Sequence, residues 1–204
     1  MLTTIDLLRH GACEGGEIFR GSSDVSLSDQ GWQQMSAAVE SEAPPWQAIV
    51  TSPLQRCARF ATQLGERSHL PVASYEDLAE IDFGDWEGRL IADVQAEQGE
   101  ALRKFWEKPS SNTPPNGESM ERFMTRQYRA WDLLLSAHRG QHILLVSHGG
   151  AIRVLLTRLL AMPVDAIVRL EVPYACLSRV KIYHSEGHKD WAQLVSHNSS
   201  LRKL

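Results

Sequence analysis

Short apolar runs alternate with amphipathic stretches along most of the chain. Four runs have the length and composition of buried strands: Ile5 to Leu8, Ala48 to Val50, Pro71 to Tyr75 and His142 to Val146. Between them, apolar residues recur every three or four positions, which predicts helices. Strands that alternate with helices favour a mostly parallel sheet with helices on both faces. We therefore expect an α/β protein with a three-layer α/β/α sandwich.

Hydroxyl side chains mark where several helices begin. Ser28 is expected to cap one helix, and Ser52 another that carries Pro53 at its first position. Ser119 opens a long helix that runs toward His138.

Two regions depart from this alternation. Residues 89–118 contain short helical pieces followed by a Pro/Ser/Asn-rich loop, and we expect them to form a small cap inserted over the sheet. Near the C-terminus, Leu177 to His184 and Trp191 to Val195 flank a turn at 185–190, which predicts a β-hairpin. No repeat or long linker divides the chain, so residues 1–204 are expected to form one domain.

Composition limits the classes of partner. The 204 residues are 43% hydrophobic and 23% charged with a net charge of −4, so no basic field attracts nucleic acid or anionic lipid. The three cysteines are scattered, which favours a reducing, cytoplasmic location over a disulfide scaffold. Asp6 comes too early for a signal-peptide core, and charged residues interrupt the most apolar stretch, 143–162. We therefore expect no membrane span.

Two segments place a histidine and a glycine directly after a strand. His10 and Gly11 follow the first strand, whereas His148 and Gly149 precede a helix expected to run to Leu160. Ligands of open α/β sheets bind beyond the carboxyl ends of the strands, so both imidazoles are candidate site residues. The free N–H groups at the start of a helix favour an anion. Either histidine alone is more often structural, but the pair favours phosphate chemistry.

Phosphate cleavage also needs cations and a proton donor. Arg9 and Arg56 are candidate cations because a guanidinium group grips phosphate oxygens with two parallel hydrogen bonds. Arg56 is expected one turn inside its helix, where a solvated helix face is the alternative. The stretch Glu80 to Gly88 is rich in carboxylates and aromatics, and burial there would raise the pKa of an acid into the working range. Its residues alone do not say which acid that is.

Five motifs in a fixed order carry a family resemblance. They are Leu8 to Gly11, Arg20 to Ser28, Ser52 to Ala58, Glu80 to Gly88 and Ser147 to Gly150. Together they resemble the histidine phosphatase superfamily, also called phosphoglycerate mutase-like. The resemblance implies that His10 is the nucleophile and becomes phosphohistidine, and that Glu80 is the proton donor. Arg9, Arg56 and His148 would hold the transferred phosphoryl group and supply its counter-charge, with no metal or other cofactor.

The resemblance also points to contacts with the rest of the substrate. It implies that Arg20 and Gly21 lie where family members contact the rest of the substrate. Gly149 is a further candidate because it opens the helix whose free N–H groups favour an anion. One departure stands beside the nucleophile: Ala12 and Cys13 replace the usual Glu-Thr.

The residues within these motifs are most similar to those of the α-ribazole phosphatases. This implies a small phosphate ester, α-ribazole 5′-phosphate or cobalamin 5′-phosphate, as substrate. A broad-specificity phosphatase, a phosphoglycerate mutase-type phosphotransferase, a protein phosphohistidine phosphatase and a non-catalytic binding module remain alternatives, and the oligomeric state stays open. Phe105 and Trp106 are candidates to stack on a flat base, although packing of the cap is favoured. Trp86 is expected to wedge the acidic loop in place.

One histidine cluster offers an alternative chemistry. His184, His188 and His197 are candidate metal ligands, but the four-residue step between the first two crosses the predicted turn. A solvated hairpin is therefore favoured over a metal site.

Overall fold

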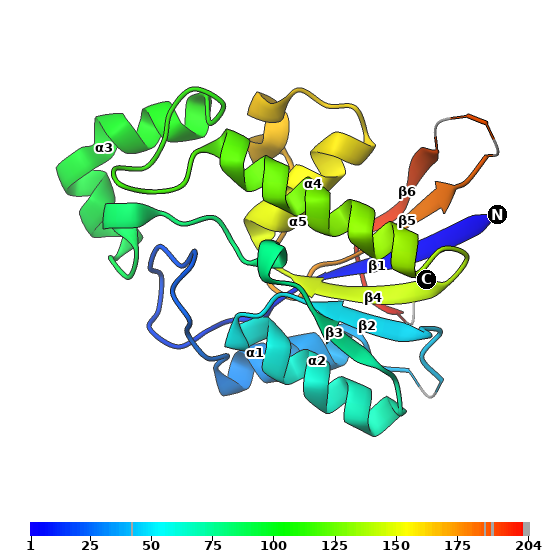
Figure 1. The fold of residues 1–204 in the computed structure, drawn as a ribbon. Helices are drawn as coiled ribbons and strands as arrows, with labels where there is room; N and C mark the ends of the chain where they lie inside the picture. The colour runs from blue at the N-terminus through cyan, green and yellow to red at the C-terminus, as the bar shows by residue number, and fades with distance from the viewer. Residues whose placement is uncertain (42, 186, 189, 202–204) are drawn as a thin grey trace.

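The sheet forms the middle of the molecule. A computed structural model describes residues 1–41, 43–185, 187–188 and 190–201. Its strands are β1 (Leu2–Arg9), β2 (Ala48–Thr51), β3 (Val72–Ser74), β4 (His142–Ser147), β5 (Leu177–Tyr183) and β6 (Trp191–Ser199). Their order is β3-β2-β4-β1-β5-β6 (Figure 1). β1 to β4 run parallel, β5 pairs antiparallel with β1, and β6 pairs antiparallel with β5, so the sheet is mostly parallel as predicted.

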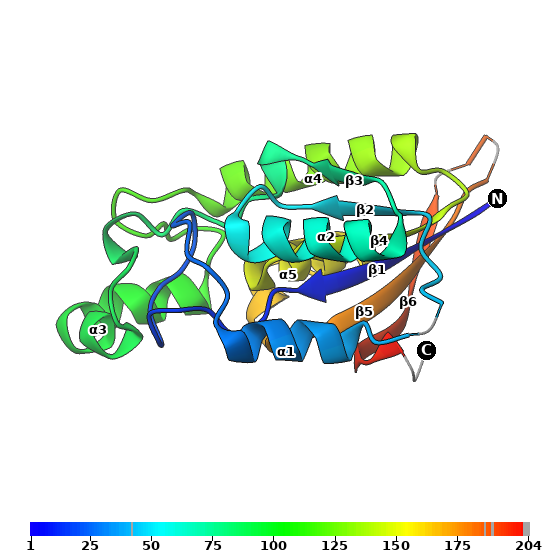
Figure 2. The same ribbon diagram turned by 90° about the horizontal axis from the view of Figure 1, so that it is seen from below.

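Helices cover both faces of this sheet (Figure 2). α1 (Asp29–Ala38) and α2 (Gln55–Ser68) lie on one face, whereas α4 (Met120–Ala137) and α5 (Gly149–Leu159) lie on the other. Because side chains alternate along a strand, Leu7 packs in the core under α4 and α5 while Leu8 packs in the core under α1 and α2. The predicted three-layer α/β/α sandwich is confirmed.

Two of the three predicted caps are confirmed. The Ser28 hydroxyl accepts from the Gly31 amide at 3.2 Å, and the Ser119 hydroxyl accepts from the Arg122 amide at 3.3 Å. The cap predicted at Ser52 is wrong, because α2 begins two residues after Pro53.

A residue distant in sequence caps α2 instead. Its first amide, from Gln55, donates to the Asp24 carboxylate at 2.7 Å, and no local pattern signals a contact across 31 residues. Arg56 is therefore the second residue of its helix, in the first turn rather than beyond it.

The region predicted as a cap forms α3 (Ile91–Glu107) and a loop. Two helical pieces join at Gln98, where the backbone leaves helical geometry (φ −131°, ψ 31°). The sequence led us to expect this cap over a face of the sheet. In the structure it lies beyond the carboxyl ends of the parallel strands (Figures 1 and 2). There Phe105 shares a buried cluster with Phe123 of α4 and Val154 of α5. Apolar packing thus fixes α3 against the starts of both helices.

Short 3₁₀ helices are η1 (Glu76–Leu78), η2 (Gly84–Trp86) and η3 (Val164–Arg169). The predicted hairpin strands pair as β5 and β6, and β6 continues to Ser199. The predicted turn at 185–190 includes Glu186 and Lys189, which lie outside the described residues. Within the described chain, no helix combines the length and apolar character needed to cross a membrane.

Candidate active site

A pocket of about 890 Å³ opens at the carboxyl ends of β1 and β4. Arg9, His10, Glu80 and Gly149 line its inner end, and residues of α3 and η3 line its outer half. Glu80 and Gly149 lie 70 and 139 positions after His10 in the sequence. The fold brings these residues together because parallel strands end at the same edge of the sheet.

His10 is held in one tautomer. It is 4% exposed, and its Nδ1 donates to the Gly11 carbonyl at 2.8 Å. Since a carbonyl only accepts, Nδ1 carries the proton and Nε2 keeps a free lone pair. Burial, reinforced by the positive charges of Arg56 and Arg9, holds the pKa of His10 well below its ordinary value. The imidazole is therefore neutral and nucleophilic at Nε2.

His148 and Arg56 lie behind His10, fully buried. The His10 and His148 rings are 5.3 Å apart in an edge-to-face arrangement. Arg56 Nε donates to His148 Nδ1 at 3.2 Å, so His148 carries its proton on Nε2 and donates it to Ser52 Oγ at 2.6 Å. Burial and Arg56 also hold the pKa of His148 well below its ordinary value. Both effects thus favour the neutral form of this second imidazole.

Arg56 ties the segment after Arg20 to the site. Its Nη2 donates to the Gly21 carbonyl at 2.6 Å and its Nη1 to the Ser23 carbonyl at 2.7 Å. Gly21 approaches the Ile81 carbonyl so closely that a Cβ would lie 1.9 Å from it, which requires glycine here. Gly21 is not among the pocket-lining residues, so it faces Arg56 rather than the space where a leaving group would lie.

Arg9 and Arg20 are among the arginines that line the pocket. Arg9 lies over the Tyr174 ring at 4.3 Å and donates through Nη1 to the Val172 carbonyl at 2.6 Å. Arg20 donates through Nη2 to two backbone carbonyls of its own loop. In the part of the chain that the structure describes, the buried Nε atoms of Arg9 and Arg20 have no acceptor. These orphaned cationic donors indicate an anion as the ligand.

Glu80 lies in the loop between η1 and η2, and its carboxylate meets the first turn of α5. One carboxylate oxygen accepts from the Gly150 amide at 2.7 Å, and the other accepts from the Ile81 amide at 3.0 Å. A Cβ on Gly150 would lie 2.5 Å from the Glu80 carboxylate, so the glycine leaves room for that side chain. Glu80 is 7% exposed and lines the pocket.

Glu87, in the same acidic stretch, is structural. Its carboxylate accepts from the amides of Gly21, Ser22, Ser23 and Phe83 and forms a short contact with the Ser23 hydroxyl. Glu87 thus fixes the loop that carries Arg20. Trp86 is fully buried against Phe19, in keeping with the predicted wedge.

The outer half of the pocket is mainly apolar. Its apolar and aromatic lining comprises Ile18, Phe19, Phe83, Ile91, Phe105, Trp106, Met120, Phe123, Ile167 and Val168. Phe105 is 2% exposed and serves packing, whereas Trp106 is 40% exposed at the mouth. The two candidate stacking residues therefore separate: one is core, and the other is available to a ligand.

The three cysteines are free and buried. Cys13, which replaces the usual Thr, lies 3.5 Å from His10 Nδ1, and burial raises its pKa, so a neutral thiol sits beside the imidazole. The preceding Ala12 offers no side-chain contact, but its amide donates to the Gln34 side chain at 2.9 Å.

Two of the three candidate metal ligands, His184 and His197, are engaged in structural contacts. His184 bonds Thr3 and Asp190, and His197 bonds Ser178 and the Glu171 carbonyl. Among the described residues, no group of three or more His, Cys, Asp or Glu side chains is placed to hold a metal ion.

Sequence reasoning missed two residues that line the inner end. Arg153 follows Gly149 and Gly150 at helical spacing, so the period of α5 would have placed it on the same face. Tyr174, whose ring lies 5.8 Å from that of His10, gave no signal because it sits in an irregular loop far along the chain.

Known proteins resemble this chain over most of its length. A bifunctional protein of Mycobacterium tuberculosis is 36% identical over 185 residues, which are 89% of this chain. The chain spans 50% of that relative's length. The glucosyl-3-phosphoglycerate phosphatase of Mycolicibacterium vanbaalenii is 31% identical over 94% of this chain and 83% of its own. The adenosylcobalamin/alpha-ribazole phosphatase of Salmonella typhimurium is 28% identical over 86% and 89%.

Solved structures and a family model agree with these relatives. The alpha-ribazole phosphatase from Shigella flexneri superposes with a TM-score of 0.80 at 27% identity, covering 96% of each chain. The native mycobacterial glucosyl-3-phosphoglycerate phosphatase gives 0.82 at 27% identity, covering 98% of this chain and 100% of its own. The model of the histidine phosphatase superfamily (branch 1) matches residues 5–194. The predicted resemblance is confirmed: this chain belongs to the histidine phosphatase superfamily.

Proposed function

We propose that this protein is a phosphatase that hydrolyses phosphomonoesters by a two-step transfer through His10. In the first step, the Nε2 lone pair attacks phosphorus, the bond from phosphorus to the leaving oxygen breaks, and the Glu80 carboxylic acid protonates that oxygen. In the second step, the Glu80 carboxylate takes a proton from water, whose oxygen attacks phosphorus. The phosphorus–nitrogen bond then breaks, which releases phosphate and returns neutral His10 and protonated Glu80.

One observation carries this proposal: His10, whose Nδ1 is bonded to the Gly11 carbonyl, lines the pocket with Arg9 and Arg20, and among the described residues the buried Nε donors of these two arginines have no protein acceptor. A phosphoryl group fits there because its oxygens accept what these donors offer. Gly149 would add a backbone N–H at the start of α5.

Arg56 and His148 act from behind the nucleophile. At least three of the five N–H groups of Arg56 are engaged, by Gly21, Ser23 and His148, so we assign at most the remaining two to the phosphoryl group. Its second task is to keep His10 unprotonated. His148 would contribute its Nε2–H, turned from Ser52 to a phosphoryl oxygen.

For the natural substrate we favour α-ribazole 5′-phosphate or cobalamin 5′-phosphate. The outer pocket is lined mainly by apolar and aromatic side chains, and exposed Trp106 stands at its mouth. Such a surface suits a leaving group that carries a flat aromatic base. The named relatives include α-ribazole phosphatases. This would place the chain in cobalamin biosynthesis, and its three free cysteines support a reducing, cytoplasmic location.

A phosphorylated sugar acid is the second candidate. Arg153 lines the inner end beside Arg9 and Arg20, which is more positive charge than one phosphate needs. Arg103 and Arg169 add charge at the outer half. A relative named glucosyl-3-phosphoglycerate phosphatase is 31% identical to the chain, close to the 28% of the adenosylcobalamin/alpha-ribazole phosphatase.

The deciding experiment is a steady-state comparison of kcat/KM. α-Ribazole 5′-phosphate, glucosyl-3-phosphoglycerate, 3-phosphoglycerate and p-nitrophenyl phosphate would be tested at one pH. We expect α-ribazole 5′-phosphate to exceed the others by roughly 10-fold or more, since a well-contacted leaving group adds binding energy in the transition state. Equal values for all four would indicate a broad-specificity enzyme. Isomerisation of 3-phosphoglycerate primed by bisphosphoglycerate, rather than release of phosphate, would contradict the hydrolase assignment.

A further inference from the structure

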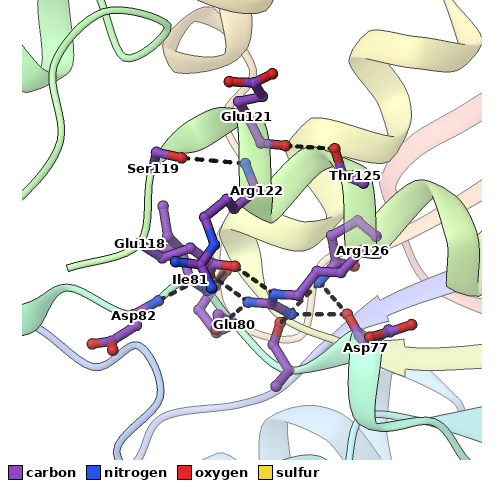
Figure 3. Close-up of polar contacts among 12 residues, drawn as sticks. Asp77, Glu80, Ile81, Asp82, Glu118, Ser119, Glu121, Arg122, Thr125 and Arg126 are labelled. Atoms are coloured by element: carbon purple, nitrogen blue, oxygen red, sulfur yellow. Dashed lines mark hydrogen bonds and ion pairs between the residues drawn. The ribbon is translucent and has the colours of Figure 1, made fainter.

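Arg126 binds the backbone that carries Glu80. It projects from α4, and its guanidinium group faces the segment around Asp77 and Glu80 (Figure 3). Nη1 donates to the Asp77 and Ala79 carbonyls at 2.8 and 2.6 Å, and Nη2 donates to the Glu80 carbonyl at 2.9 Å. Nε and Nη2 donate to the Glu118 carboxylate at 2.7 Å each. A guanidinium group has five N–H donors, so every one is used.

Glu118 extends this contact to the other side of Glu80. Its amide donates to the Asp82 carbonyl at 2.8 Å, and its carboxylate accepts from the Asp82 amide at 3.4 Å. The Arg126–Glu118 pair is largely buried, with side chains 20% and 13% exposed. Residues before and after Glu80 are thus fixed by one ion pair.

Neighbouring side chains on α4 do less. Gln127 donates to the Asp77 and Ala79 carbonyls, and so duplicates part of the Arg126 contact. Arg129 pairs with the Asp77 carboxylate on the surface. By contrast, Arg126 donates directly to the carbonyl of Glu80 itself. The Glu80 side chain leaves from this anchored backbone toward the Gly150 amide and the pocket.

We propose that Arg126, together with Glu118, is a positioning residue for the proton donor: it sets where the Glu80 carboxyl group meets the leaving oxygen without touching substrate. This inference rests on the proposed function, in which Glu80 is the acid. A displaced acid would slow only the step that needs its proton. Attack by His10 on a good leaving group would proceed almost unchanged.

The test compares leaving groups. Arg126→Gln, Glu80→Gln and the Arg126→Gln/Glu80→Gln double variant would be assayed on an alkyl phosphate and on p-nitrophenyl phosphate, whose leaving oxygen hardly needs a proton. We expect Arg126→Gln to lower kcat for the alkyl ester by roughly 100-fold, as misplacement of about 1 Å does. For p-nitrophenyl phosphate, kcat should fall by less than about 3-fold, since no proton transfer is lost. In the Glu80→Gln background, Arg126→Gln should cause no further leaving-group-specific loss.

The controls separate positioning from general stability. Arg129→Gln removes the same charge from the same helix and a contact to the same segment, and should leave the ratio of the two rates unchanged. Arg126→Lys keeps the charge but has three donors for five acceptors, and should not restore the ratio. If Arg126→Gln does not fold, Glu118→Gln and the neutral double replacement Arg126→Gln/Glu118→Gln provide the same comparison.

The outcomes distinguish this inference from the function on which it rests. Equal loss on both substrates in the Arg126 variants, or losses that add to those of Glu80→Gln, would overturn the positioning role. Equal loss on both substrates in Glu80→Gln would instead remove Glu80 from the acid role, and the proposed mechanism would fail first.

Discussion

The two ends of the pocket differ in the burial and polarity of the side chains that line them. At the inner end, His10, Arg56 and His148 are nearly or fully buried, and each of these three side chains is hydrogen-bonded to a named partner. In the outer half, the lining is mainly apolar, and Trp106 stands half-exposed at the mouth. The inner end is thus a preorganised polar site, whereas the outer half offers shape and apolar surface.

This difference assigns chemistry and specificity to separate parts of the chain. Preorganised charges and donors act on developing charge in the transition state, so changes at the inner end should reduce catalysis for every substrate. Apolar contacts with a leaving group act on one class of ester, so changes in the outer half should alter selectivity. The predictions below test that separation.

The largest effect should follow loss of the nucleophile. His10→Gln removes the lone pair that attacks phosphorus, and kcat should fall by about 10⁴-fold or more on every ester, as for removal of other enzyme nucleophiles. Phosphate release by the purified variant measures this. Gln fills similar space, so the melting temperature of the variant checks that the fold is retained. Substantial turnover without His10 would remove it from the nucleophilic role.

A single methyl group should disturb the acid. Gly150→Ala places a Cβ 2.5 Å from the Glu80 carboxylate, the mobile end of a side chain, so the carboxyl group must move while the backbone stays. We expect roughly 10- to 100-fold loss of kcat on an alkyl phosphate and a small change on p-nitrophenyl phosphate. Thermal unfolding should shift little. An unchanged rate on both esters would mean that the position of Glu80 does not limit the reaction.

The inner end should also make stability depend on pH. His10 and His148 have pKa values well below 6.5 in the folded state, so below pH 6.5 the unfolded chain binds protons that the folded chain refuses. The two histidines therefore do not lower the free energy of unfolding above pH 6.5. As the pH decreases below 6.5, the free energy of unfolding falls by up to about 1.4 kcal/mol per pH unit for each histidine. Urea unfolding at pH 7.5, 6 and 5 measures this slope.

A variant isolates the contribution of one imidazole. In His10→Gln the same slope should be lower by up to about 1.4 kcal/mol per pH unit, because only His148 then refuses its proton. Asp6 does not interfere with this comparison. Burial raises its pKa, but hydrogen bonds from Arg179, His142 and Trp46 outweigh that effect and lower it, so Asp6 changes the stability only near and below pH 4. An identical slope in wild type and variant would mean that His10 is not kept neutral by the fold.

The smallest effect belongs to the outer half. Trp106→Ala should raise KM for α-ribazole 5′-phosphate by about 5-fold, since an aromatic pair is worth about 1 kcal/mol beyond area burial. The KM for p-nitrophenyl phosphate, which is too small to reach the pocket mouth, should change little. Tyr183→Ala, a substitution of an aromatic residue on β5 away from the pocket, is the matched control. Equal change for both esters in Trp106→Ala would exclude stacking.

The same contrast explains what the sequence could predict. Strand periodicity, together with the rule that parallel strands end at one edge, was sufficient to place His10 and His148 together. Glu80 came from the family resemblance and not from the pattern of carboxylates. The anchoring of Glu80 by Arg126 was not predictable, because the contact joins residues 46 positions apart through backbone carbonyls, which leave no trace in the sequence.

Long-range contacts account for the remaining differences. The prediction that Ser52 caps α2 was wrong because the first amide of the helix donates to Asp24 and not to the nearby Ser52 hydroxyl. The Ser52 hydroxyl accepts from His148 and from the amide of Leu54, which precedes the helix. The position of α3 beyond the strand ends depends on packing against the starts of α4 and α5, which hydrophobic periodicity alone does not specify.

The most direct test of the mechanism is to trap the covalent intermediate. The enzyme would be mixed with a ³²P-labelled phosphomonoester, quenched at millisecond times under alkaline conditions that preserve phosphohistidine, and digested for mass spectrometry. The mechanism predicts one labelled peptide, with phosphate on Nε2 of His10, that forms before free phosphate appears and is absent in His10→Gln. Phosphate on another side chain, or complete turnover with no labelled protein at any time, would contradict it.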